Sequence, residues 1–99
     1  MIDGLVAGRL YGDAEQRIDK AGKPFTVAKV RANTADGETL FVNVIAFEAS
    51  VCAALRALLD GDSLALTGSI TPRVWTDKQG VTKPALDMVA QRILAVQAE

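Results

Sequence analysis

The chain has 99 residues and a formal net charge of −1, with 49% hydrophobic and 23% charged residues. This length is sufficient for one hydrophobic core but not for two, so we expect residues 1–99 to form a single domain. The sequence contains no long uncharged apolar segment and begins with nothing like a signal peptide, which excludes a membrane-spanning helix and favours a cytoplasmic protein.

The first third of the chain predicts two strands. One covers residues 4–10, where the interior Gly8 indicates a bulge or a sharp bend. Residues 11–19 are polar and are expected to be irregular or weakly extended, ending in a turn. A second strand, over residues 25–33, alternates between small side chains and larger ones. The larger side chains on its outer face are Phe25, Val27, Lys29 and Arg31.

The strand predicted over residues 39–47 is the centre of the chain. One face is uniformly aliphatic, as expected of a core face, and comprises Leu40, Val42, Val44 and Ala46. The other face comprises Phe41, Asn43, Ile45 and Phe47. A short Asp-Gly turn precedes this strand, which predicts an antiparallel hairpin with Lys29 and Arg31 beside Phe41 and Asn43. Aromatic rings flanked by cations are suited to binding a sugar-phosphate chain with exposed bases.

A helix is predicted over residues 48–60, because apolar residues recur there at helical spacing and Gly61 marks an end. These apolar positions are Val51, Cys52, Leu55, Leu58 and Leu59. The next strand, over residues 63–73, directs Leu64, Leu66, Gly68 and Ile70 inward and Arg73 outward, with Trp75 in the same parity. After a turn at 76–80, a last strand covers residues 81–96. Five strands with a helix between the third and fourth are typical of an all-β OB-fold, a small Greek-key barrel.

The residues offer no support for an enzyme or a cofactor. Histidine is absent, and no group of carboxylates has the spacing of a metal site or of an acid–base pair. Cys52 falls on the apolar side of the predicted helix, which indicates a small core residue rather than a reactive thiol. We therefore expect no catalysis, no bound metal and no cofactor.

The aromatic residues leave alternatives open. Phe41 and Phe47 would form a binding platform, an oligomer interface or a contact with the helix. Trp75 would stack on a base or form a lid across the mouth of the barrel. The near-neutral net charge is compatible with a basic face, because the cations fall in or beside strands and most acids fall at turns and ends.

Motifs along the chain are similar to those of a known family. Gly8-Arg9-Leu10, with Asp13 and Glu15, resembles the opening Gly-Asn-Leu-Gly-x-Asp-Pro-Glu of that family. Residues 22–25 resemble its Gly-Lys-x-Val turn, and residues 39–47 resemble Thr-Glu-Trp-His-Arg-Val-Val-x-Phe.

The second half of the chain continues the resemblance. Residues 59–64 and 68–70 are similar to Leu-x-Lys-Gly-Asp-x-Val followed by Gly-x-Leu. Residues 73–80, Arg-Val-Trp-Thr-Asp-Lys-Gln-Gly, are close to the most specific motif, Arg-x-Trp-x-Asp-x-x-Gly. In order and spacing, residues from 5 to about 89 resemble the bacterial single-stranded DNA-binding proteins.

This resemblance implies sequence-tolerant binding of single-stranded DNA in replication, recombination or repair. Phe41, Phe47 and Trp75 match family positions that stack on bases, and stacking tolerates any base because each has a π face. Strand parity adds Arg73, Lys29 and Arg31 as phosphate contacts, with the Asn43 amide between the rings. Stacking alone does not sense the 2′-hydroxyl, so RNA stays open as a ligand.

The chain departs from the family in three places. The hairpin between the second and third strands lacks the long loop that carries a further tryptophan, and Val42 replaces the family histidine. The sequence ends at residues 97–99 without a linker and acidic tail. We expect a homo-oligomer, either a tetramer or a dimer, in the bacterial cytoplasm and associated with the nucleoid. The alternative is an accessory primosomal-type module that acts mainly through contacts with other replication proteins.

Overall fold

The computed structural model describes residues 2–96. In chain order, the elements are β1 (Ile2–Ile18), β2 (Pro24–Asn33), β3 (Thr39–Ala46), α1 (Ala49–Arg56), β4 (Ser63–Thr76) and β5 (Thr82–Val96). The expectation of a tail-less C-terminus falls on residues 97–99, which lie outside the described residues.

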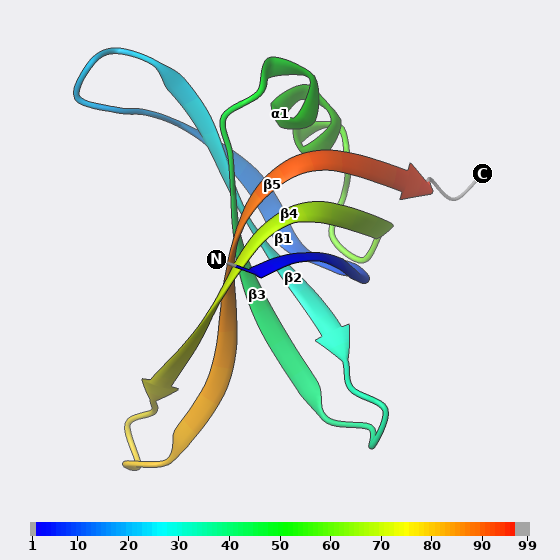
Figure 1. The fold of residues 1–99 in the computed structure, drawn as a ribbon, viewed down its shortest axis with the longest axis vertical. Helices are drawn as coiled ribbons and strands as arrows, with labels where there is room; N and C mark the ends of the chain where they lie inside the picture. Colours follow the sequence, from blue (N-terminus) through cyan, green and yellow to red (C-terminus); the bar gives the residue numbers. More distant parts are fainter. Residues whose placement is uncertain (1, 97–99) are drawn as a thin grey trace.

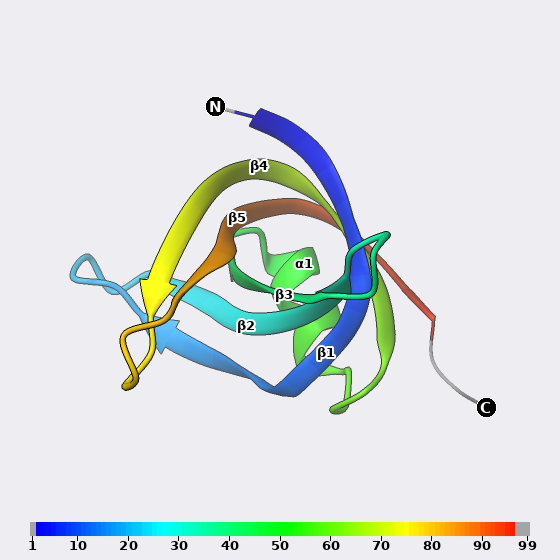
Figure 2. The same cartoon turned by 90° about the horizontal axis from the view of Figure 1, so that it is seen from below.

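The strands close into one barrel in the order β1-β2-β3-β5-β4. All neighbouring pairs are antiparallel except β3 and β5, which are parallel. Figure 2 shows the ring of strands from one end, and Figure 1 shows α1 across the other end. The predicted all-β OB-fold, with its helix between the third and fourth strands, is confirmed. In the described part of the chain, no helix is long and apolar enough to cross a membrane.

β1 is longer than the sequence predicted. Its first half pairs with β4 from Ile2 to Arg9, and its second half pairs with β2 as far as Ile18. Of the two alternatives expected for residues 11–19, irregular or weakly extended, the structure has extended strand as far as Ile18. Alternation of apolar and polar residues reveals a strand only where one of its faces is buried. The second half of β1 is almost entirely exposed, so its pairing with β2 produces no apolar pattern in the sequence.

Gly8 lies where β1 changes partner. A Cβ atom at this position would be 2.4 Å from the backbone oxygen of Arg31, so the two strands approach too closely for a side chain. The shift in register comes later, between Tyr11 and Glu15, and Gly12 within it has a φ of 72°. Gly8 therefore serves the close approach of β2, and the bulge lies four residues further on.

The core lies inside the barrel and beneath α1. The predicted inward faces of β2, β3 and β4 are confirmed, with Val30, Val42 and Leu66 fully buried. α1 contributes Leu55 and Cys52, whose thiol donates a hydrogen bond to the carbonyl of Ala46 at 3.2 Å. Cys52 is therefore the core residue that its position in the sequence predicted.

The helix is shorter than expected, because it ends at Arg56 rather than near residue 60. The following turn is held by the carboxylate of Asp62, which accepts a hydrogen bond from the backbone N–H of Leu59 at 2.8 Å. This turn leaves Leu59 69% exposed, whereas Leu58 is buried. The prediction that Leu59 lies within the helix was wrong, because the helix ends at Arg56.

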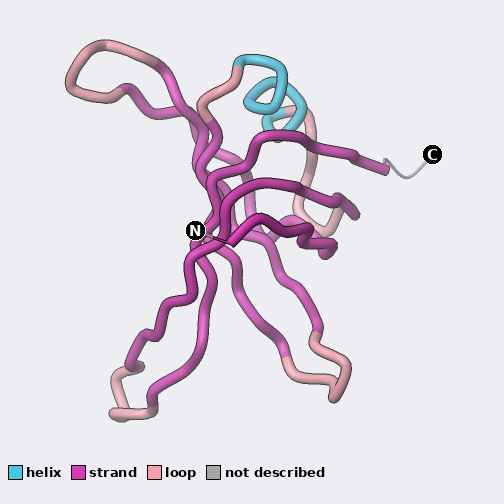
Figure 3. The backbone as a smooth tube through the Cα atoms, in the orientation of Figure 1, coloured by secondary structure: helices cyan, strands magenta, loops and turns pink. Residues whose placement is uncertain are grey.

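In the β4–β5 hairpin, β4 continues three residues beyond its predicted end, to Thr76, whereas β5 agrees with the predicted strand to within one residue. The end of β4 and the start of β5 run together away from the barrel (Figure 1). The β2–β3 and β4–β5 turns both lie at the end of the molecule opposite α1 (Figure 3). Two arms thus project from the same end of the barrel, one on each side of the surface described next.

Candidate nucleic-acid interface

The cross-strand register brings the outward-facing residues of β2, β3, β5 and β4 onto one surface, which we call the outer face. One row across it consists of Lys29, Asn43, Asp87 and Thr71. The next row consists of Arg31, Phe41, Ala85 and Arg73. Trp75 and Lys83 form a cross-strand pair further along the β4–β5 hairpin. The expected placement of Lys29 and Arg31 beside Asn43 and Phe41 is confirmed.

A groove of about 970 Å³ crosses the outer face. Of the predicted site residues, Lys29, Asn43 and Arg73 line it. The others lie outside this groove, and they divide into separate aromatic groups. The groove is thus lined by both charged and apolar side chains, with Tyr11 among them and the other aromatic rings outside it.

The first aromatic group consists of Phe41, Tyr11 and two cations. The Tyr11 and Phe41 rings meet edge to face, with centroids 5.4 Å apart and planes at 73°. The Arg31 guanidinium carbon lies 4.9 Å from the Tyr11 centroid and 5.9 Å from that of Phe41. The Lys29 ammonium is 5.9 Å from the Phe41 centroid. These distances are within the range of cation–π attraction, so rings and cations hold one another in place.

Tyr11 was not among the residues predicted for this surface. The sequence analysis ended the first strand at residue 10, and so it never assigned Tyr11 to a face. Continuing the parity of Arg9 by one more step would have found it. Tyr11 is 47% exposed, a high value for a large side chain. Part of its ring is therefore accessible to a ligand.

Phe47 belongs to a second aromatic group, at the other end of β3. Its ring centroid lies 6.0 Å from that of Phe25, with an angle of 42° between the planes. Phe47 is 56% exposed. The two predicted phenylalanines therefore do not form one continuous platform, because Asn43 and Ile45 separate them along the strand.

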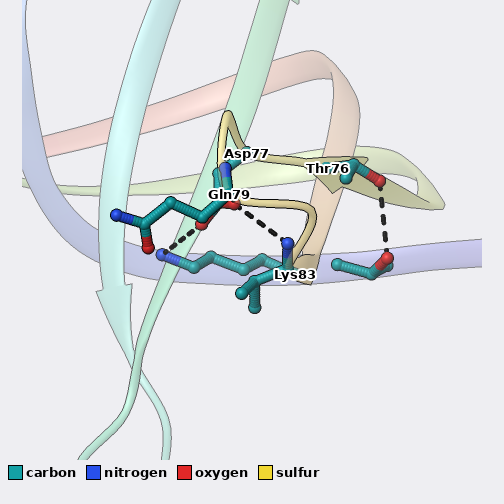
Figure 4. Close-up of polar contacts among 6 residues, drawn as sticks. Thr76, Asp77, Gln79 and Lys83 are labelled. Carbon is teal, nitrogen blue, oxygen red and sulfur yellow. Dashed lines mark hydrogen bonds and ion pairs between the residues drawn. The ribbon is translucent and has the colours of Figure 1, made fainter.

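Trp75 lies on the projecting arm and is 42% exposed. The Lys83 ammonium is 5.4 Å from the centroid of the indole and 3.7 Å from a carboxylate oxygen of Asp77. Asp77 also accepts hydrogen bonds from the backbone N–H groups of Gln79 and Val81, both at 2.9 Å, which builds the turn (Figure 4). The bond from Val81 is the main cause that lowers the pKa of Asp77 below its ordinary value of 3.8, and Lys83 adds to the effect.

Arg73 is held by a carboxylate that the sequence analysis did not single out. Its Nε donates a hydrogen bond to Oδ2 of Asp87 at 2.8 Å. The Asn43 side-chain amide donates to Oδ1 of the same carboxylate at 3.3 Å. Alternation along the last predicted strand places Asp87 outward, and so it could have been found. Its contact with Arg73 and Asn43 links three strands across the centre of the groove.

The comparisons with known proteins agree with this architecture. Residues 1–96 match the model of the single-strand binding protein family. No curated protein matches the sequence. The fold is similar to the crystal structure of a small single-stranded DNA-binding protein from Streptomyces coelicolor, with a TM-score of 0.75 and 18% identity, covering 96% of this chain and 94% of the other.

A second similar structure is a Plasmodium falciparum SSB in complex with ssDNA, with a TM-score of 0.72 and 12% identity. That match covers 98% of this chain and 96% of the other. At such identities the structural likeness concerns the fold, whereas the family match rests on the sequence of residues 1–96. This chain therefore belongs to the single-strand binding protein family.

Proposed function

We propose that the chain binds single-stranded DNA on the outer face, without preference for sequence. The observation that carries this proposal is the group of Tyr11, Phe41, Lys29 and Arg31, which combines two rings and two cations within 5.9 Å. A single strand offers unpaired bases to the rings and phosphates to the cations. Membership of the single-strand binding family supports the same reading.

The residues divide by the part of the strand that they would contact. Ring surfaces for the bases are provided by the pair Phe41 and Tyr11, by Phe47 and by Trp75. Each base stacked on such a ring typically contributes about 1–3 kcal/mol to the binding free energy. Among the described residues, Lys29 and Arg31 take part in no ion pair, so phosphates would meet no internal competitor there. Asn43 provides an amide between the aromatic groups. RNA offers the same bases and phosphates, and is a second ligand to test.

A protein of this kind would act in replication, recombination or repair, in the bacterial cytoplasm with the nucleoid DNA. It would protect or hold exposed strands without catalysing a reaction. The proposed role needs no cofactor, because stacking and ionic contacts supply the binding free energy.

The test is a titration of oligo-dT into the protein at two salt concentrations. Trp75 is the only tryptophan, so the fluorescence change reports on one position. We expect quenching that saturates at low salt and weakens at high salt, because bound phosphates release counterions. Failure to bind oligo-dT at low salt would refute the proposed function.

A second candidate function, contact with other protein chains, is favoured by an apolar patch on β1, β4 and β5, which lines a hollow shared with Arg31 of the outer face. By register, Ala7 faces Ala65 and Ala65 faces Leu94, and Leu5 lies two residues from Ala7 on the same side of β1. Leu5 is 63% and Leu94 is 70% exposed. A second copy of the chain would cover this apolar patch and give the expected dimer or tetramer, and a replication protein is the other possible occupant. Such contacts weaken little with salt, unlike contacts with phosphates.

A further inference from the structure

The centre of the groove on the outer face carries a negative charge. Asp87 lies on β5 between β3 and β4, with Asn43 and Thr71 as its cross-strand neighbours. Its two carboxylate oxygens accept hydrogen bonds from Asn43 and Arg73, at 3.3 and 2.8 Å. Asn43 is a residue that the proposed function assigns to DNA, and Arg73 is the phosphate contact predicted from strand parity. A carboxylate therefore occupies the polar groups that a phosphate would need.

The ionic balance of the groove supports the importance of this contact. The acids lining it are Asp13, Glu15 and Asp87, and the cations are Arg17, Lys29 and Arg73. Three negative charges thus oppose three positive ones. Arg17 is paired with Glu15 at 3.3 Å, and Arg73 is paired with Asp87. The groove is therefore neutral as a whole, although its ligand would be a polyanion.

The pair between Arg73 and Asp87 is placed so that a ligand can open it. The Arg73 side chain is 61% exposed and that of Asp87 is 41% exposed. Ion pairs at such exposure contribute little to stability, because water screens them. A phosphate oxygen can therefore replace Oδ2 of Asp87 as the acceptor for Arg73 without unfolding any element.

We propose that Asp87 sets the strength of single-strand binding by competing with DNA phosphates for Arg73. This inference rests on the proposed function and adds a limit to it. In the free protein Asp87 neutralises Arg73 and repels the backbone, and in the complex a phosphate takes its place. The affinity of the wild-type protein is lower than the cations on the outer face would otherwise allow.

Two other roles for Asp87 predict different behaviour. If the carboxylate mainly holds Arg73 in the posture that binds DNA, then its removal weakens binding. If it reads bases by accepting a hydrogen bond from an amino group, as carboxylates do with cytosine, then its removal affects oligo-dC and leaves oligo-dT unchanged. Competition for Arg73 instead predicts stronger binding to both, because both have the same phosphates.

The test compares wild type with Asp87→Asn, on oligo-dT and oligo-dC of equal length at several salt concentrations. We expect roughly 2- to 10-fold tighter binding of both at low salt. The slope of log K against log salt should steepen by about 0.7, the value for one further phosphate contact on a single strand. In the Asp87→Asn background, Arg73→Gln should remove the added slope.

The matched control is Glu38→Gln, which removes one negative charge from the β2–β3 turn and should give a much smaller gain. Weaker or unchanged binding by Asp87→Asn, or a gain equalled by Glu38→Gln, would overturn the inference while the proposed function stands. If wild type itself does not bind, the proposed function fails first.

A second measurement does not depend on Asp87→Asn folding. Arg73→Gln alone should flatten the salt slope less than Lys29→Gln does, because Arg73 is already neutralised and Lys29 is not. Equal losses of slope would count against the inference.

Discussion

Solvent-exposed rings on the outer face carry most of the proposed binding. A half-exposed indole such as Trp75 leaves apolar area in water, and a stacked base would cover it. Its neighbour in the structure is Lys83 on the same arm, so the ring is braced from within the hairpin. The alternative of a lid over the barrel mouth is not favoured by this position, because the arm projects away from the barrel (Figure 1).

For Trp75→Ala we expect single-strand binding to weaken by about 1–3 kcal/mol, the usual contribution of one stacked base. The free energy of unfolding should fall by about 1 kcal/mol or less, because the ring lies at the surface. Polarisation of a labelled oligonucleotide measures binding when the tryptophan is gone. Val74→Ala is the control, since Val74 is 73% exposed and adjacent on the opposite side of β4. A loss of unfolding free energy above about 3 kcal/mol would assign Trp75 to the core.

Tyr11 offers a sharper test, because the sequence motifs did not indicate it. Tyr11→Ala should weaken binding by about 1 kcal/mol or more, since it removes both a stacking surface and the edge-to-face contact with Phe41. Tyr11→Phe keeps the ring and should bind like wild type. If Tyr11→Ala also binds like wild type in a polarisation titration, then the outer face ends at Phe41.

One β-strand of this barrel, β1, pairs with two different neighbours along its length. Its first half is hydrogen bonded to β4 and its second half to β2, and the change occurs at Gly8 and Arg9. The missing side chain at Gly8 allows β2 to approach. The pairing of β1 with β2 brings Tyr11 across from Lys29. The close approach at Gly8 thus helps to place the Tyr11 ring beside the outer face.

Gly8→Ala should lower the free energy of unfolding by about 1–3 kcal/mol, because the new Cβ would meet a backbone oxygen at 2.4 Å and the strands must separate. Gly4→Ala, in the same strand, is the control. Its Cβ would be 2.9 Å from the end of the Ile70 side chain, which can rotate away. Chemical denaturation measures both, and equal losses would show that close approach is not what matters at Gly8.

The arm that carries Trp75 should respond to pH through Asp77. Its pKa in the folded chain is lowered from 3.8, chiefly by the hydrogen bond from Val81, so the ionised form stabilises the fold above that value. The stabilisation is lost as the pH falls through the lowered folded pKa. Thermal melts should therefore give the wild type a higher melting temperature than Asp77→Asn at pH 7. This difference in melting temperature should shrink in strong acid. A difference independent of pH would contradict this account.

The molecule as a whole presents two surfaces of different character. The outer face combines charged side chains with aromatic rings, whereas the apolar patch on β1, β4 and β5 exposes Leu5 and Leu94. Val42, which occupies the position of the family histidine, is fully buried in the core and so cannot touch a second copy. We therefore expect self-association to use the apolar patch around Leu94 rather than position 42.

For self-association, sedimentation equilibrium should give a mass above the 10.5 kDa of one chain. Leu94→Glu should lower the mass toward the monomer, because a charge on the apolar patch would be buried without a partner. Leu59→Glu is the matched control, since Leu59 is 69% exposed but lies in the turn after α1. A mass unaffected by Leu94→Glu would place the interface elsewhere.

Much of the architecture was predictable because it depends on local pattern. Alternation assigned the inward residues of β2, β3 and β4, and the Asp-Gly turn indicated the hairpin that brings Arg31 beside Phe41. The limits of β1 and α1 were not predictable in the same way. Pairing between exposed strands leaves no apolar pattern, and the apolar residues Leu58 and Leu59 continue the helical spacing past Arg56, where the helix ends.

The sequence by itself determined which sides of β2, β3 and β4 face the core, where the tight turns lie, and to which family the motifs belong. These features depend on neighbours within a few residues, and period-two alternation is the same wherever the strand is placed. Only the tertiary structure decided which outward residues of strands distant in the sequence touch. Arg73 meets Asp87 and Asn43, and Tyr11 meets Phe41, because barrel closure sets the register between β3 and β5 and between β1 and its two partners. That register is fixed by packing of the whole core, which no local stretch of sequence contains.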